Sequence, residues 1–387
     1  VPELRFPGFT DDWEERKLSN VVSLLGGNAF KSKDSVTEEG VRWLKIANVS
    51  NSGIKWNEES FLPSDYWERY PNYRIVAGDY VMALTRPIIA HELKIAKMPL
   101  GSNALLNQRV AKLIWNMNAD FGFQLLRKRN VVDYIEQTIS GTDPPNLSGN
   151  TFEKIMVSVP KTVEQEKIGR FLETVDNLLA VNQRKLDLLK EQKKGYLQKM
   201  FPKNGAKVPE LRFAGFADDW EERKLGDITK ISTGKLDANA MVENGKYDFY
   251  TSGIKKYRID VAAFEGPSIT IAGNGATVGY MHLANNKFNA YQRTYVLQEF
   301  LVDRSFIFSE IGNKLPKKIK QEARTGNIPY IVMDMLTELK LSIPQNNSEQ
   351  QKIGSFFKQL DDTIDLHQRK LDLLKEQKKG FLQKMFV

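Results

Sequence analysis

Apolar residues between positions 164 and 201 recur in alternating steps of four and three. The positions are Ile168, Leu172, Val175, Leu179, Leu186, Leu189, Tyr196 and Met200, with Asn182 and Lys193 filling the two remaining places. This spacing is typical of a coiled-coil seam and not merely of one amphipathic helix. A second stretch keeps the same phase, with Ile353, Phe357, Leu360, Ile364, His367, Leu371, Leu374, Lys378, Phe381 and Met385. We therefore predict two long helices whose seams pair, each roughly 55 Å long at about 1.5 Å per residue.

A polar residue holds the same heptad position near the middle of each predicted helix. These residues are Asn182 and His367. A buried polar residue at such a position costs stability and fixes the register of the pair. We predict that the two side chains meet. The alternative is that both lie at a solvated part of the seam.

The two helical stretches belong to a chain that repeats itself in two blocks. The nineteen residues "QRKLDLLKEQKKGYLQKMF" (183–201) return at 368–386, with Phe381 replacing Tyr196 as the one change. The stretch 1–18 returns at 208–225 with 16 of 18 positions identical. Repeats of this kind predict duplicated structural units. We divide the chain into a domain over 1–160, a helical spacer and linker over 161–207, a second domain over 208–344 and a helical spacer over 345–387.

The two segments between the repeats share an order of elements while sharing few residues. Alternating stretches such as "RWLKIANV", "YRIVAGDYVMAL", "SITIAG" and "RTYVL" predict short strands separated by Gly and Asn turns. Each segment then has a helical passage, 121–139 or 304–324, and a final strand. Pro316 lies inside the second passage and is expected to split that helix into two pieces. We predict an α+β fold class, with two equivalent domains on a repeated coiled coil.

Composition and charge narrow the possible functions. The chain contains no cysteine, which excludes disulfides, thiol catalysis and cysteine zinc sites. It has no run of 18 apolar residues and no signal-peptide pattern at its start, so we expect a cytoplasmic protein without a membrane partner. The net charge of +8 resides in the two nineteen-residue repeats, which carry +4 each. Net charge by itself therefore supports a nucleic-acid partner only weakly.

Patterns that could indicate catalysis do not combine into a site. "GNGATVG" (273–279) lacks the Lys and Ser/Thr of a phosphate-binding loop and precedes a strand-like stretch. "NIPY" (327–330) is similar to a motif with which amino-methyltransferases hold a flipped base, but no Gly-rich cofactor turn accompanies it. Glu15 and Lys17 form a short E-x-K pattern that recurs by chance. The histidines His91, His282 and His367 lie far apart in sequence, so we predict no catalytic residue and no metal site.

Candidate DNA-contacting residues lie in strand turns and in one basic passage. The turns contain Lys45, Asn48, Arg86, Ser252, Lys255, Lys256, Tyr257, Asn274 and Thr277. "NQRVAKLI" and "YQRTYVLQ" place Gln108 beside Arg109 and Gln292 beside Arg293, and such side chains contact adenine and guanine bidentately in a major groove. The passage "NKLPKKIKQEARTGN" adds Lys317, Lys318 and Arg324, which suit phosphate contacts. The alternative is that these polar side chains satisfy backbone groups at a sheet edge.

Taken together, the motifs resemble the specificity subunit of type I restriction-modification enzymes over essentially the whole chain. The resemblance is carried by "DDWEERKLSNVV" and "DDWEERKLGDIT" at the domain starts, by "SVPKTVEQEKIGRFL" and "SIPQNNSEQQKIGSFF" at the strand-to-helix junctions, by "GNGATVG" and by the two long helices. The first domain departs from this pattern, with "ALTRPIIAHELKI" where the second has "IAGNGATVGYM".

The resemblance implies two target-recognition domains, each reading one half of a split target in double-stranded DNA. It implies that the helices form an intramolecular antiparallel coiled coil with a pseudo-two-fold repeat and hold the domains a fixed distance apart. It further implies two methyltransferase subunits and two restriction and motor subunits as partners. S-adenosylmethionine, ATP and Mg would bind in those partners, with no cofactor in this chain. Two alternatives stay open: a self-contained DNA adenine methyltransferase, and a coiled-coil adapter without a nucleic-acid partner.

Overall fold

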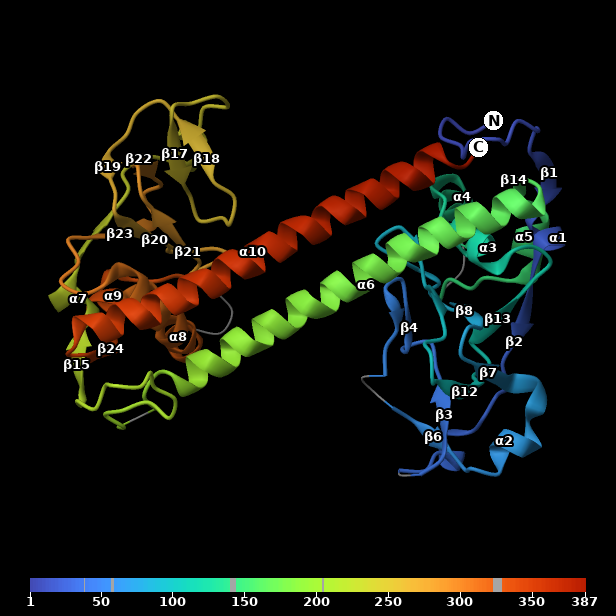
Figure 1. Cartoon of the computed structure of the whole chain (residues 1–387), viewed down its shortest axis with the longest axis horizontal. Coiled ribbons are helices and arrows are strands. Elements are labelled where there is room, and N and C mark those ends of the chain that lie inside the picture. The colour runs from blue at the N-terminus through green and yellow to red at the C-terminus, as the bar shows by residue number, and fades with distance from the viewer. Residues whose placement is uncertain (38, 57–58, 140–143, 204, 323–328) are drawn as a thin grey trace. The chain divides into compact units, whose positions relative to one another are not determined.

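The chain divides into two compact units, which are described separately. The computed structural model describes residues 1–37, 39–56, 59–139, 144–203, 205–322 and 329–387 (Figure 1). The first unit contains Val1–Asn182 and Lys370–Val387, and the second contains Gln183–Arg369. Each unit therefore combines one α/β domain with a part of both long helices, a grouping that cuts across the four predicted segments.

The strands of the first unit form two layered sheets and several short ladders. They are β1 (Glu14–Lys17), β2 (Val22–Gly26), β3 (Val41–Leu44), β4 (Val49–Ser50), β5 (Gly53–Ile54), β6 (Phe61–Leu62), β7 (Arg74–Val76), β8 (Tyr80–Ala83), β9 (Ile88–Ile89), β10 (Glu92–Leu93), β11 (Ile95–Lys97), β12 (Asn103–Leu106), β13 (Val110–Trp115) and β14 (Met156–Val159). The sheets have the orders β11-β8-β13-β2 and β6-β3-β12-β7, and β12 runs parallel to β3. All four residues of β8 are buried, so this strand packs on both of its faces, whereas the predicted alternation implied packing on one.

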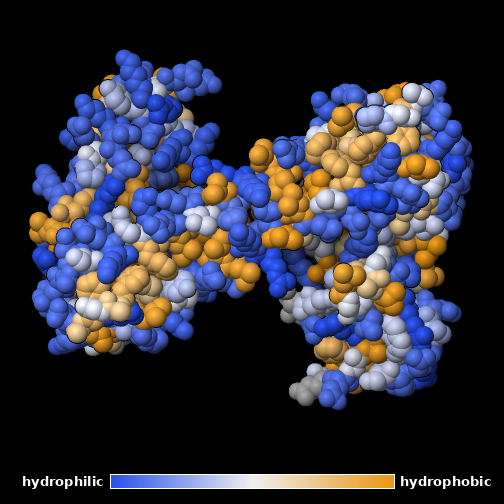
Figure 2. All heavy atoms as spheres, viewed as in Figure 1, coloured by the Kyte–Doolittle hydropathy of each residue, from blue (hydrophilic) through white to orange (hydrophobic). Residues whose placement is uncertain are grey.

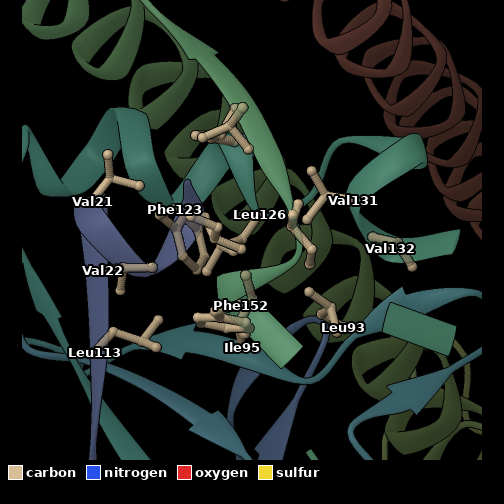
Figure 3. Packing of buried hydrophobic residues seen from close by; sticks show 14 of the residues in the cluster. Val21, Val22, Leu93, Ile95, Leu113, Phe123, Leu126, Val131, Val132 and Phe152 are labelled. Carbon is tan, nitrogen blue, oxygen red and sulfur yellow. The ribbon is translucent and has the colours of Figure 1, made fainter. Parts of the chain in front are cut away.

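Short helices pack on both sheets. They are α1 (Leu18–Val21), α2 (Tyr66–Arg69), α3 (Ala119–Leu125), α4 (Arg129–Ile139) and α5 (Gly149–Glu153), with 3-10 turns η1 (Ser32–Asp34) and η2 (Pro71–Tyr73). Helix α2 packs against the second sheet, and α1, α3, α4 and α5 pack against the core of the first. The helical passage predicted over 121–139 is formed by α3 and α4. The Asn118 side chain accepts a hydrogen bond from the Phe121 N–H and so caps α3. Figure 3 shows the resulting core, in which Val22, Leu113 and Phe123 pack together.

The second unit repeats this sheet order with different residues. Its strands are β15 (Trp220–Lys224), β16 (Lys230–Thr233), β17 (Tyr247–Tyr250), β18 (Tyr257–Ile259), β19 (Phe264–Glu265), β20 (Ser268–Ala272), β21 (Met281–Ala284), β22 (Lys287–Ala290), β23 (Thr294–Gln298) and β24 (Lys340–Pro344). The sheets have the orders β16-β23-β20-β21 and β18-β17-β22-β19, and β17 runs parallel to β22. The shared order of elements predicted from the sequence is therefore found in the two four-stranded sheets of each unit, while the ladders β4-β5 and β9-β10 occur in the first unit.

The helices of the second domain include one that corrects a prediction. They are α7 (Leu225–Ile228), α8 (Arg304–Glu322) and α9 (Met333–Thr337), with the 3-10 turn η3 (Ala238–Ala240). Pro316 lies inside α8 and does not split it, so the expected break is wrong. A proline in a helix interior costs about 3 kcal/mol through a lost hydrogen bond and a clash. Four large side chains that α8 buries on one face, among them Phe306 and Leu315, offset that cost.

The long helices are α6 (Thr162–Lys199) and α10 (Asn347–Lys384) (Figure 1). In the first unit, Phe171 packs edge-on against Phe381 with ring centroids 5.0 Å apart, and Asp176 pairs with Lys378. Residue numbers rise along α6 as they fall along α10, so the two helices run antiparallel. None of the helices in the described residues is both long and apolar enough to cross a membrane.

The second unit holds the opposite ends of the same two helices in an equivalent way. Tyr196 packs edge-on against Phe356 at 5.0 Å, and Lys193 pairs with Asp361. These four positions correspond, through the repeat, to those that pair in the first unit. The predicted fold class is confirmed: two α/β domains are combined with an intramolecular antiparallel coiled coil.

The residues predicted for the seam all have restricted exposure. All twenty are buried or partly buried, including Leu172, Leu179, Leu186, Leu189, Phe357, Ile364, Leu371 and Leu374. Asn182 is 5% exposed and its amide donates to the Leu178 carbonyl at 2.7 Å. The Nδ1 atom of His367 is buried without a hydrogen-bond partner among the described residues. The predicted contact between Asn182 and His367 would pass from one unit to the other and stays a prediction.

The repeated stretch at the start of each domain anchors that domain to a long helix. Arg5 forms a bidentate pair with Glu164 in the first turn of α6, with a 2.7 Å contact. Arg212 forms the same pair with Glu349 in the first turn of α10, also at 2.7 Å. Both carboxylates are almost fully buried. A buried ion pair thus attaches the start of each domain to the first turn of a long helix.

Candidate nucleic-acid interface

Three turns of the second domain meet at one edge. They comprise residues 251–256 after β17, residues 273–280 between β20 and β21, and residues 291–293 between β22 and β23. The Tyr291 N–H donates to the Tyr250 carbonyl at 2.9 Å, and the Gly273 N–H donates to the Arg293 carbonyl at 2.8 Å. The candidate residues of these turns are therefore neighbours in space although the sequence separates them.

A cluster of small polar side chains fixes two of these turns to each other. The Ser252 hydroxyl donates to the Asn274 side-chain oxygen, and the Thr277 hydroxyl donates to the Ser252 carbonyl. Gly275 has a φ of +86°, a conformation that glycine adopts without steric cost. The three side chains are partly buried and hold the edge in one arrangement.

Two lysines beside aromatic rings supply positive charge at this edge. Lys255 lies 5.4 Å from the ring centroid of Tyr257, and Lys256 lies 5.5 Å from that of Tyr250. Burial raises the pKa of Tyr250 to about 12 and lowers the pKa of His282, whose ring lies 5.1 Å from that of Tyr250. Both rings are therefore neutral at pH 7, and the exposed lysines carry the charge.

The Gln-Arg pairs occupy the same place in both domains. Gln108–Arg109 lies in the turn between β12 and β13, and Gln292–Arg293 lies in the turn between β22 and β23. The glutamine N–H donates to the Asn28 carbonyl in the first domain at 2.9 Å and to the Leu236 carbonyl in the second at 2.8 Å. All four side chains are exposed. The backbone N–H group of each glutamine is thus hydrogen-bonded within the domain. The exposed side chains remain available to an external ligand.

Helix α8 lies next to the turn 273–280 of the second domain. A side chain at Gly279 would come within 2.7 Å of the Ile319 Cδ1 atom, so the helix and the turn are in close contact. Lys317 is exposed, and Lys318 is partly buried and pairs with Glu322 at 2.9 Å. Arg324 lies outside the described residues. Lys317 is therefore an exposed cation on the helix that packs against this turn.

The first domain places its candidates on the corresponding edge. The Lys45 ammonium lies 4.0 Å from the Trp43 ring centroid and donates to the Ser60 hydroxyl at 2.9 Å. Arg86 is exposed, has a φ of +49°, and donates its N–H to the Pro145 carbonyl at 2.8 Å. The Leu84 N–H donates to the Arg109 carbonyl at 2.9 Å, as Gly273 does to Arg293.

Asn48 has a different role from the one expected of a base-contacting residue. Its side chain is 2% exposed. The side-chain oxygen accepts from the Lys45 N–H at 3.0 Å, and the amide nitrogen donates to the Lys55 carbonyl at 3.0 Å. Both polar groups of this side chain are bonded to the main chain. For Asn48 the geometry therefore favours the alternative interpretation, that the residue satisfies backbone groups.

Sequence reasoning did not single out two residues that the structure places at these edges. Lys94 donates to the Ile46 carbonyl at 3.1 Å, and burial lowers its pKa. Tyr330 is 51% exposed and forms an isolated β-bridge with Asn274. The only sequence signal for Tyr330 was its membership of "NIPY", whose Asn327 and Ile328 lie outside the described residues. Lys94 lies in an alternating strand stretch that gave no such signal.

The residues considered for catalysis do not come together in the described parts of the chain. Glu15 and Lys17 lie in β1, which pairs with β14. His91 contacts Glu136 at 3.0 Å in the first unit, whereas His282 lies in the second domain and His367 on α10. No group of three or more metal-binding side chains is found among the described residues.

Comparison with known proteins gives one consistent family. A family model described as "Type I restriction modification DNA specificity domain" matches residues 10–191 and 217–376. The chain is 34% identical over 188 residues to the type I restriction enzyme MjaVIII specificity subunit of Methanocaldococcus jannaschii, a match covering 48% of this chain and 44% of that protein. It is 34% identical over 148 residues to the EcoDI specificity subunit of Escherichia coli, covering 38% of this chain and 33% of that protein. The matched parts thus span less than half the length of these two relatives.

One solved structure shares the complete fold. The S subunit of the type I restriction-modification system from M. genitalium superimposes with a TM-score of 0.72 at 16% sequence identity. The superposition covers 100% of this chain and 99% of that one. At this level of identity the likeness concerns the arrangement of the domains' elements and says nothing of which bases are contacted.

Proposed function

Because the chain belongs to the type I restriction modification DNA specificity family, we propose that it is a non-catalytic subunit that reads a two-part target in double-stranded DNA. Each domain contacts one half of the target. The observation that carries this proposal is the paired edge: the two domains share the main-chain bonds around Gln108–Arg109 and Gln292–Arg293 and differ in most other exposed side chains. The shared main-chain bonds would place both domains on DNA in the same way. The different exposed side chains would then let each domain bind a different base sequence.

The chemistry of each edge suits a duplex. Arg109 and Arg293 can each donate two hydrogen bonds to a guanine, and the neighbouring glutamines can do the same for adenine. Arg86, Lys255, Lys256 and Lys317 supply charge for phosphates, which position a protein on DNA without specifying sequence. The bonded cluster around Asn274 holds the second edge in place before DNA arrives, so less entropy is lost on binding.

The outer faces of the long helices suit protein partners. Each helix exposes two apolar side chains seven residues apart, Val181 (65%) and Leu188 (50%) on α6 and Leu366 (60%) and Leu373 (59%) on α10. Figure 2 shows hydrophobic residues reaching the surface along both helices. Heptad spacing on an exposed face is what an additional packed helix requires.

The two faces correspond through the repeat, so they can bind two copies of one partner. We assign them to two methyltransferase subunits, which would hold S-adenosylmethionine and methylate adenine. Two restriction and motor subunits would bind ATP and Mg and cleave DNA. This chain would direct both reactions by selecting the site.

Substitutions in the Gln-Arg pairs test the DNA part of the proposal. Arg109→Ala should relax the base preference at one position of one half of the target, and Arg293→Ala should do so in the other half. A lost bidentate contact costs about 1 to 3 kcal/mol of discrimination. Lys317→Ala should weaken binding to all sequences and reduce the salt dependence by about one phosphate contact. Selection of duplexes from a random pool by the assembled complex measures both effects, and unchanged preferences in both arginine variants would refute the proposal.

A separate experiment tests the partner surface. Leu188→Glu and Leu373→Glu place a charge on the exposed apolar faces and should lower the number of methyltransferase subunits that co-purify with the chain. Asp187→Ala, next to Leu188, is the matched control and should leave assembly unchanged. Labelled S-adenosylmethionine bound by the purified chain alone would instead favour a self-contained methyltransferase.

A further inference from the structure

A short hairpin lies beside α4 at the edge of the first domain that is proposed to contact DNA. It consists of β9 and β10 and lies between Arg86 and Lys94. The Lys94 N–H donates to the Pro87 carbonyl at 2.6 Å and closes the hairpin. The Lys94 ammonium donates to the Ile46 carbonyl, one residue beyond Lys45. The hairpin therefore emerges among the basic residues assigned to this edge.

The base of the hairpin is anchored in the domain core. Leu93 is 2% exposed and lies among the core side chains shown in Figure 3. Ile88 is partly buried and packs against the same core. Glu92 accepts a hydrogen bond from the Asn51 amide at 2.6 Å, and His91 contacts Glu136 at 3.0 Å. These contacts on both strands hold the tip in one position.

The tip is an unfavourable turn that carries an exposed apolar residue. Ala90 and His91 connect the strands with φ values of +50° and +59°. Two-residue hairpin turns in which both residues have positive φ favour Asn-Gly. Each residue with a β-carbon is less stable in this conformation by about 1 to 2 kcal/mol. Ile89, the last residue of β9, is 52% exposed. The strained turn and the exposed isoleucine beside it are the two observations from which a contact with an apolar ligand group is inferred.

We propose that this hairpin enters the major groove of the first half of the target and that Ile89 contacts the methyl group of a thymine. The proposal rests on the proposed function, because it requires the edge to bind DNA. The major groove admits a two-stranded β-ribbon, and the thymine C5-methyl is the apolar group that it displays. Arg86 is exposed at the base of the hairpin and can contact a phosphate at the rim of the groove. Lys94, whose ammonium is bonded to the Ile46 carbonyl, holds the base of the hairpin to the domain.

The second domain supports this assignment by contrast. In its sheet β20 and β21 take the places of β8 and β11, and the turn between them carries Asn274 and Thr277. Those side chains are polar and bonded to Ser252. The two domains thus present different chemistry at the same place: an apolar contact in the first and hydrogen-bonding groups in the second.

Uracil substitution in the target tests the contact directly, because uracil differs from thymine only by that methyl group. The assembled complex is used to select a duplex from a random pool, and each thymine of that duplex is then replaced by uracil. Wild-type binding should weaken by about fourfold at one position in one half of the target, the factor for one buried methyl group. Ile89→Ala should weaken binding to the thymine duplex by a similar factor and should be insensitive to uracil at that position.

Two further variants separate the contact from effects on folding. Ile89→Thr keeps the branched shape and should lose the same discrimination. Ile114→Ala, at a 39% exposed apolar position in β13, is the matched control and should retain sensitivity to uracil. If wild type selects no sequence, the proposed function fails and this inference with it. If wild type selects a duplex but no uracil position distinguishes it from Ile89→Ala, this inference alone is overturned.

Discussion

Replacing Lys378 by methionine should stabilise the first unit at neutral pH. Lys378 lies in the seam with 13% of its side chain exposed and pairs with Asp176. The same carboxylate also binds Arg127 at 3.1 Å, so one carboxylate serves two cations. Burial, together with the charge of Arg127, lowers the pKa of Lys378 from 10.5 to about 8. The folded state therefore disfavours the charged lysine.

The size and sign of the effect follow from this pKa. Between pH 8 and 10.5 the unfolded chain binds more protons at Lys378 than the folded chain does, so the free energy of unfolding rises with pH across that window. The penalty is fully present below pH 8 and is lost above 10.5. At about 1.36 kcal/mol per pH unit it amounts to about 3 kcal/mol at pH 7 and about 1.4 kcal/mol at pH 9.5. Methionine keeps the packing of the aliphatic stem, so the variant should gain these amounts.

Urea denaturation at pH 7 and 9.5 measures the difference in unfolding free energy between the variant and wild type. Urea is uncharged, so it does not screen the charges of the protein as guanidinium chloride would. Lys193→Met is the matched control, because Lys193 holds the equivalent place opposite Asp361 in the second unit. Burial already raises the pKa of Asp361, and removing its cation should destabilise the protein. A Lys378→Met variant that is less stable than wild type at pH 7, or a gain that does not shrink towards pH 9.5, would refute the reasoning.

Three other perturbations have defined outcomes. Arg212→Met leaves the fully buried Glu349 without its cation and should cost about 3 to 5 kcal/mol of unfolding free energy, measured in urea; a cost below about 1 kcal/mol would contradict the anchoring role. Burial raises the pKa of Glu310 to about 7, so the folded state binds the extra proton between pH 4.5 and 7 and loses stability as pH rises. Glu310→Gln should therefore stabilise the protein by up to about 3 kcal/mol at pH 8 and have no such effect at pH 4.5, and an equal gain at both pH values would exclude this explanation. Inserting four residues into the middle of α6 adds about 6 Å of helix and should change the spacing between the two half-targets while both sequences are kept; mapping the modified sites would show an altered half-target if the helix did more than set spacing.

The sequence predicted the architecture because its signals were local or repeated. The four-three stepping of apolar residues depends on nothing but helix geometry, and the duplicated stretches implied equivalent units before any strand was placed. Pro316 was misjudged because its local cost was weighed without the packing of Phe306 and Leu315 around α8. That packing depends on residues that are distant in the sequence, so the residues around Pro316 do not reveal it.

The candidate site was only partly predictable for the same reason. The exposed turn positions of Arg109 and Arg293 could be predicted from the strands on either side of them, and their role in DNA contact stays a prediction. The bonds between Ser252, Asn274 and Thr277 depend on β17 and β20 meeting through other strands, which spacing alone does not reveal. Asn48 looked like its polar neighbours in sequence, and its burial could be known only from the fold.

A domain exchange shows whether each domain reads its own half of the target. Residues 226–344 are exchanged for the corresponding segment of a relative, and methylated adenines are mapped in the genome of cells that carry either chain with the same partner subunits. If each domain reads one half of the target, one half changes and the other is identical in both maps. A change in both halves, or a target that does not divide into two parts, would contradict this division of target reading.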